Sequence, residues 1–195
     1  MTQPNFLSVT RSLDAALAFC ARNPSLPSST AYTGRLTSTS QHFATTTAET
    51  DAAYTRWRQA VGQELGALRQ LRLEIARVME LLDEHGYDDA PVRRIIYTER
   101  ADMLRATDEL LEFLTRHQSE WDWIAGRVSA LRALIVAAND RRRAADSLLA
   151  VYQVQVKARV SAYGRALADV QEYLQDVRGD VRDPASIAEL QLLTL

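Results

Sequence analysis

The sequence predicts an all-α fold, a long antiparallel coiled coil or three-helix bundle preceded by a short amphipathic helix and a Ser/Thr-rich extended arm. The first observation is a series of apolar residues that recur about every 3.5 residues, the coiled-coil period. The series begins with Tyr54, Trp57, Val61, Leu65, Leu68, Leu71, Ile75, Val78 and Leu82. The second observation is composition, because only 7 Gly and 5 Pro occur in 195 residues. Such a chain favours long helices over turns.

The N-terminal stretch, residues 6–22, is predicted to form a short amphipathic helix. Its apolar residues fall on one helical stripe, namely Phe6, Val9, Leu13, Leu17 and Cys20. Asn23 and Pro24 follow, and a proline after such a stripe ends a helix. We therefore expect the helix to stop at about residue 22.

Residues 24–48 change in character, since Ser and Thr dominate and Arg35 is the single Asp, Glu, Lys or Arg among them. This composition is typical of a linker or an extended arm. Two interpretations remain open. The segment is a flexible tether, which composition favours, or an arm that packs along a neighbouring subunit through Tyr32, Leu36 and Phe43. Residues 1–48 are thus predicted to form one segment of the chain.

Residues 49–180 are predicted to form the helical bundle. Gly86 stands where a helix commonly ends in a left-handed residue, Asp89 is a suitable N-cap, and Pro91 suits a first helical turn. A connection at 86–90 is short. We therefore expect the helices before and after it to lie antiparallel and adjacent.

The segment 139–143, with the sequence NDRRR, leaves two alternatives for residues 91–178. The heptad register passes through it without a shift, no Gly or Pro marks a break, and three arginines would oppose the dipole of a helix that began there. A single helix of that length would, however, be rare in a globular domain. A second turn at 139–143 would give a self-sufficient three-helix bundle, and we slightly prefer it.

Several side chains are predicted to mediate contacts between helices or chains. Arg142 falls on the seam, the stripe of heptad positions that faces a partner helix in a coiled coil. A charged residue there can fix register or oligomeric state. Tyr163 belongs to an apolar face that is wider than a two-stranded seam needs. Trp123 lies off the seam, as an interface anchor would. A last short helix within 181–195 is predicted to start at Asp183 and Pro184 and to dock through Ile187, Leu190 and Leu193.

No catalytic, cofactor-binding or metal-binding residues are predicted. The Glu-x-x-His pattern of ferritin-like bundles is missing, and His117 on the seam is better explained as a core histidine. Cys20 lies on an apolar stripe, as a small buried residue does. No Gly-rich phosphate loop occurs. We therefore expect a non-enzymatic protein without a small-molecule ligand.

The charge and hydropathy of the sequence limit the kinds of partner and the cellular location that we expect. The net charge is −2 with both signs interspersed, which makes a nucleic-acid partner improbable and a membrane unlikely to attract the chain. No apolar run is long enough to cross a membrane, and Asp14 interrupts the N-terminal one. A cytoplasmic protein is expected, or one exported without a cleaved signal peptide. Lys157 is the one lysine among 23 basic residues, which suggests a GC-rich bacterial genome.

These observations predict a structural or interaction protein, a helical coiled-coil subunit that self-associates or forms part of a larger assembly. Two alternatives stay open. The order of an amphipathic helix followed by a helical bundle resembles the BAR family, which implies a membrane-binding helical dimer, although BAR domains use Lys/Arg-rich faces. The segment RDPASIAELQ, residues 182–191, is similar to type III needle subunits, which implies a component or substrate of a bacterial secretion or injection apparatus.

Overall fold

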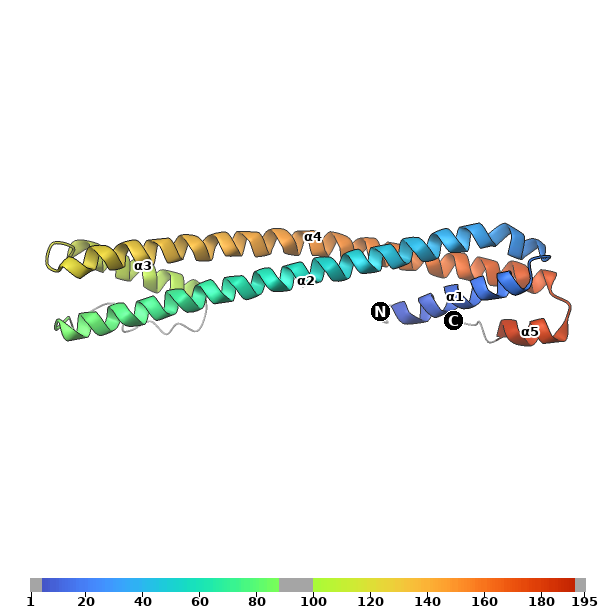
Figure 1. The fold of residues 1–195 in the computed structure, drawn as a ribbon, viewed down its shortest axis with the longest axis horizontal. Helices are drawn as coiled ribbons and strands as arrows, with labels where there is room; N and C mark the ends of the chain where they lie inside the picture. Colours follow the sequence, from blue (N-terminus) through green and yellow to red (C-terminus); the bar gives the residue numbers. More distant parts are fainter. Residues whose placement is uncertain (1–4, 88–99, 192–195) are drawn as a thin grey trace. The chain divides into compact units, whose positions relative to one another are not determined.

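The computed structural model describes residues 5–87 and 100–191, and these residues form an all-α fold without strands, as predicted (Figure 1). The five helices are α1 (Phe6–Arg22), α2 (Pro27–Glu84), α3 (Arg100–Arg116), α4 (Asp122–Asp180) and α5 (Pro184–Gln191). The chain divides into two compact units, and each unit contains one part of α2 and one part of α4. Unit 1 comprises residues 1–54 and 150–195, and unit 2 comprises residues 55–149.

Helix α1 confirms the predicted amphipathic helix and its bounds. The Asn5 side chain accepts a hydrogen bond from the Ser8 N–H at 3.2 Å and so caps the first turn. At the other end, the Asn23 side-chain amide donates to the Phe19 carbonyl. The apolar stripe packs into unit 1, where Leu13 is fully buried.

The extended arm predicted for residues 24–48 is wrong, because α2 begins at Pro27 and continues through this stretch. Ser/Thr side chains disfavour a helix only weakly, and here their hydroxyls bond to the carbonyl four residues earlier. Thr33 donates to the Ser29 carbonyl at 2.6 Å and Thr37 to the Thr33 carbonyl at 2.7 Å. The apolar residues of the segment are buried within unit 1 of the same chain, so tertiary packing overrides composition.

The core of unit 1 is formed by one face of α1, the first part of α2 and the last part of α4 (Figure 1). Direct bonds show that α2 and α4 run antiparallel there, since Ser28 pairs with Asp180 and Thr39 with Asp169. Apolar side chains from all three helices and α5 fill the space between them. They are Val9, Leu13, Ala16, Phe19, Cys20, Tyr32, Leu36, Phe43, Ala162, Ala166, Val170, Tyr173, Leu174, Val177, Val181 and Leu190.

Helix α2 ends as predicted at Gly86, which has a φ of +77°. The Gly86 N–H donates to the Asp83 carbonyl and the Tyr87 N–H to the Leu82 carbonyl, the two bonds of a Schellman motif. The cap predicted at Asp89 and the first-turn proline Pro91 lie outside the described residues.

The helix that follows α2 in the described chain does not run antiparallel to it, which corrects the predicted hairpin. Arg100, at the start of α3, contacts Glu64 in the middle of α2. Tyr87, just after the end of α2, instead contacts Phe113 near the end of α3. Helix α3 therefore runs in the same direction as α2. The antiparallel neighbour of α2 in unit 2 is α4, as the contact of Glu74 with Arg127 shows.

The preferred second turn at 139–143 is wrong, because these residues lie within α4. A single helix over 91–178 is also wrong, since the chain breaks at 117–121 between α3 and α4. The heptad spacing of the sequence continues through residues 117–121, so it does not indicate this break. Ring contacts and hydrogen bonds around His117 and Trp121, described below, stabilise the turn in place of another helical turn.

The core of unit 2 is a second three-helix arrangement in which α3 packs on α2 and α4 (Figure 1). Its buried side chains come from all three helices, and those from α2 belong to the apolar series predicted above. They are Leu68, Leu71, Ile75, Val78, Leu82, Met103, Ala106, Leu110, Leu114, Ile124, Val128, Leu131 and Ala138. The helical cover that the seam of α2 and α4 requires comes from α3 in unit 2 and from α1 in unit 1.

The predicted C-terminal helix is confirmed as α5, one residue after Asp183. The Asp183 carboxylate accepts bonds from the N–H and hydroxyl of Ser186, both at 3.0 Å, as an N-cap does. Helix α4 ends at Asp180, directly after Gly179. Leu190 docks on unit 1 of its own chain.

Candidate functional site: exposed helix faces

The outer face of α1 combines one large apolar side chain with two opposite charges. Leu7 is 72% exposed, the highest value among the large apolar residues of the described chain. Arg11, Asp14 and Ala18 share this face and are exposed as well. The opposite face of α1 is buried in unit 1, so the outer face is held on a fixed support.

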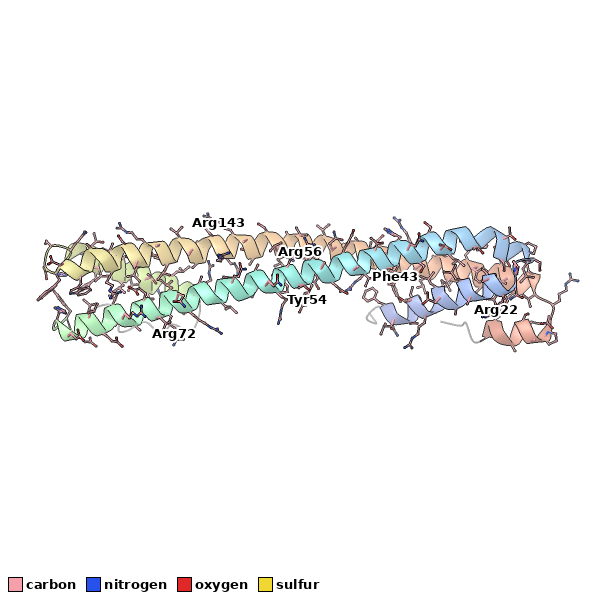
Figure 2. The ribbon with its side chains drawn as sticks, in the orientation of Figure 1. Arg22, Phe43, Tyr54, Arg56, Arg72 and Arg143 are labelled. Carbon is pink, nitrogen blue, oxygen red and sulfur yellow. The ribbon has the colours of Figure 1, made fainter. Side chains whose placement is uncertain are left out.

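An apolar groove of about 410 Å³ lies beside Leu7, between the first turns of α1 and the middle of α2. Phe43 (Figure 2) and Phe6 contribute to its lining, and their ring centroids are 6.2 Å apart. Small α2 residues, including Ala44 and Ala48, form the other wall. A helix or an apolar side chain from outside could approach the backbone of α2 closely there.

Helix α4 exposes further apolar side chains in unit 1. Val151, Val154 and Val160 are 47%, 63% and 46% exposed. Between residues 150 and 161 the sequence contains two charged residues, Lys157 and Arg159. Arg159 lies over the Phe6 ring, 4.5 Å from its centroid, and pairs with an α2 carboxylate. This stretch therefore has a surface poor in charge and rich in branched apolar groups.

Polar bonds join α2 to α4 next to these apolar surfaces. Arg35 donates to Asp169 and Glu172, and the Tyr32 hydroxyl donates to Asp176 and Glu172. The bonds from Arg35 and Tyr32 hold the pKa of Glu172 below its ordinary value. The neighbouring carboxylates raise the pKa of Tyr32, with the bond to Asp176 as the largest cause. These contacts fix the register of the two helices in unit 1.

The predicted seam residue Arg142 lies beside a buried carboxylate in unit 2. Glu64 is 5% exposed and pairs with Arg142 at 3.7 Å and with Arg100 at 3.3 Å. The Arg142 side chain is 48% exposed and also bonds Asp146 within α4 at 3.0 Å. Glu64 thus joins α2 to both α3 and α4, and Arg142 is one of its two partners.

Trp123 lies in an aromatic cluster at the turn between α3 and α4. Its ring centroid is 5.6 Å from that of His85, and the Trp121 ring centroid is 4.3 Å from the same imidazole. Trp123 is partly buried against the core, and its indole N–H is buried without a hydrogen-bond partner. Trp121, which is 39% exposed, is the more accessible of the two indoles.

The same turn brings together groups that the sequence does not single out. The Trp121 N–H donates to the Tyr87 hydroxyl at 3.1 Å, and that hydroxyl donates to Glu120. His117 contacts the other oxygen of Glu120 at 2.7 Å. The bonds from Tyr87 and His117 lower the pKa of Glu120. The predicted seam position of His117 is wrong, because this residue lies in the turn and not in a helix.

The other predicted contact residues divide between core and surface. Tyr32, Phe43 and Leu190 are buried in unit 1, and Tyr163 is partly buried against the same core. Ile187 is 42% exposed. Leu193 lies outside the described residues. Leu7 was not predicted as a contact residue, although its position off the apolar stripe of α1 is visible in the sequence.

Across residues 5–87 and 100–191, no group of three or more His, Cys, Asp or Glu side chains has an arrangement that could hold a metal ion. The free Cys20 is buried. None of the described helices combines the length and the apolar character needed to span a bilayer.

Comparison with known proteins gives no relative from which a function could be transferred. No protein-family model, no curated protein and no solved structure matches the chain.

Proposed function

We propose that this chain is a structural or interaction protein without enzymatic activity, a helical coiled-coil subunit that self-associates or forms part of a larger assembly. The observation that carries this proposal is the set of exposed apolar side chains in unit 1. Leu7, Val151, Val154 and Val160 all lie outside the core, on helices whose other faces are buried. Val151 and Val154 lie three residues apart on one face of α4, and neighbouring exposed apolar groups are typical of protein interfaces.

The charge pattern of these surfaces supports a protein partner. The α4 residues from 150 to 161 carry no acidic group. Interface centres are depleted in charge because the desolvation of a charged group is costly. A second helix that packed on such a surface would bury apolar groups at little electrostatic cost.

Sedimentation equilibrium of the full chain over a wide concentration range tests this proposal. We expect reversible association, because the exposed faces are apolar but not extensive. Replacing Leu7 by Ser should weaken it without a loss of helicity, since this side chain does not belong to the core. A full chain that stays monomeric at every concentration contradicts self-association, and failure to bind any protein from its native source contradicts the wider assembly role.

Two competing predictions are separated from this proposal by direct measurements. A membrane-binding dimer of the BAR type should co-sediment with anionic vesicles in a salt-dependent manner. A subunit of an injection apparatus should give filaments or rings in electron micrographs. Discrete small oligomers that do not pellet with vesicles would favour the interaction protein over both alternatives.

A further inference from the structure

We infer that α1 is the self-association surface and that it binds the same helix of a second copy in antiparallel orientation. This inference rests on the proposed self-association and gives it a place and a geometry. The surface consists of Leu7, Arg11, Asp14, Ala18 and Ala21, all of them exposed. It is called the α1 outer seam below.

The spacing of the α1 outer seam is that of a coiled-coil interface. Its members follow one another after four and three residues in alternation, which places them on one stripe of the helix. The stripe that faces the core has its own residues, including Val9 and Leu13. Helix α1 thus carries two seams, and within the described chain the outer one faces no other helix.

Charge complementarity selects a second copy as the partner and antiparallel as the direction. If two copies cross midway between residues 12 and 13, Arg11 of each copy faces Asp14 of the other, and Leu7 faces Ala18. A parallel pair in register would instead place Arg11 against Arg11 and Asp14 against Asp14. Opposite charges attract across a seam and like charges repel, so only the antiparallel pair satisfies both ions.

Both ions are available for such a pair. Among the described residues, neither the Arg11 nor the Asp14 side chain forms a hydrogen bond or ion pair, although the two are three positions apart on the same helix. Leu7 of one copy would face the small Ala18 of the other, which allows the two helices to approach closely. The seam therefore offers two symmetric ion pairs that flank the centre and two apolar contacts at its ends.

The groove beside Leu7 extends this surface onto α2. It holds about 410 Å³ between Phe6, Phe43 and the small residues of α2. A stable dimer usually buries about 800 Å² on each partner, more than one short helix provides. A copy of α1 docked along the outer seam would cover the rim of the groove and so add the contacts that the helix pair alone lacks.

Charge exchange in the full chain, followed by sedimentation equilibrium, tests this inference. The variants R11D and D14R should each weaken the dimer about tenfold, because each places like charges together twice. The double variant R11D/D14R restores opposite charges and should return the dissociation constant close to that of the wild type. The control is R72D, a charge reversal at an exposed α2 residue of unit 2 (Figure 2), which should leave association unchanged. Circular dichroism checks that each variant keeps its helical content.

The possible results separate this inference from the proposal on which it rests. A wild-type chain that never associates overturns both. A wild-type chain that associates while R11D and D14R leave its dissociation constant unchanged overturns the role of α1 and keeps self-association. Weakening in both single variants without recovery in the double variant overturns the antiparallel pairing.

Discussion

The backbone N–H of Ser28 donates a hydrogen bond of 2.8 Å to the carboxylate of Asp180, 152 residues later in the chain. The bond joins the first turn of α2 to the last residue of α4. Asp180 serves as an N-cap from another helix, since it satisfies one of the free N–H groups at the start of α2.

Replacement of Asp180 by Ala should lower the melting temperature of the chain by a few degrees at neutral pH, because the start of α2 loses its cap. Thermal denaturation followed by circular dichroism measures the effect. The control is E49A, which removes an exposed carboxylate from α2. Equal melting temperatures for D180A and E49A would show that the bond contributes nothing to stability.

The contribution of Asp180 should disappear in acid. The neighbouring Ser28 hydroxyl and N–H hold the pKa of the carboxyl below its ordinary value of 3.8 in the folded chain. A lowered pKa means that the stabilisation is fully present above the unfolded value and is lost as the pH falls through the folded one. The gap between wild type and D180A should therefore be constant from pH 7 to about pH 5 and narrow below about pH 4. A gap that stays constant into acid would contradict this linkage.

Sequence patterns predicted the helix ends that depend on local chemistry in this chain. They did not predict the features that depend on contacts between residues far apart in the sequence. The helix stop at Gly86 follows from its positive φ, and the α5 start from the Asp183 side chain. The helical state of residues 27–48 depends instead on burial of Leu36 and Phe43 against α1 and α4. No local rule reports such packing.

The sequence did not reveal the break at 117–121 because this break also depends on contacts with distant residues. Heptads continue through it, and its stabilising partner Tyr87 belongs to a segment thirty residues earlier. The outer seam of α1 was missed for a different reason. Its spacing was visible, but Leu7 becomes conspicuous only once the opposite stripe of α1 is known to be buried.

Replacement of Leu71 by Ala should destabilise unit 2 by about 2–5 kcal/mol, because it leaves a cavity among fully buried side chains. Leu71 is 0% exposed at the contact of α2 with the α3 and α4 core. Urea denaturation provides the measurement. The matched control is L73A, since Leu73 on the same helix is 54% exposed. Its effect should stay within about 0.5 kcal/mol. Similar losses for the two variants would contradict the assigned face of α2.

Replacement of Glu64 by Gln should cost more stability than replacement of Arg142 by Ala, although the two residues form one ion pair. Glu64 is buried, and the Arg100 Nε that forms an ion pair with it at 3.3 Å is buried without a hydrogen-bond partner. Loss of the carboxylate charge should cost about 1.5–3 kcal/mol. The half-exposed Arg142 contributes less than about 1 kcal/mol, as surface ion pairs do. Urea denaturation distinguishes the two.

The control for this comparison is E80Q, at an exposed glutamate of the same helix, which should match the wild type. If R142A proves as harmful as E64Q, the seam arginine and not the buried carboxylate fixes the register of α2 and α4.

Proline at position 144 should be severely destabilising, because α4 continues from Asp122 to Asp180 without a turn. Ala144 is exposed, so its replacement changes the backbone without disturbing the core. Arg143 beside it points away from α2 (Figure 2). A proline inside a helix removes one backbone hydrogen bond and clashes with the carbonyl four residues earlier, at about 3 kcal/mol or more. The control A144G keeps the N–H and should cost about 1 kcal/mol. Denaturation midpoints compare the two variants. If A144P is as stable as A144G, the chain has a turn at 139–143 after all.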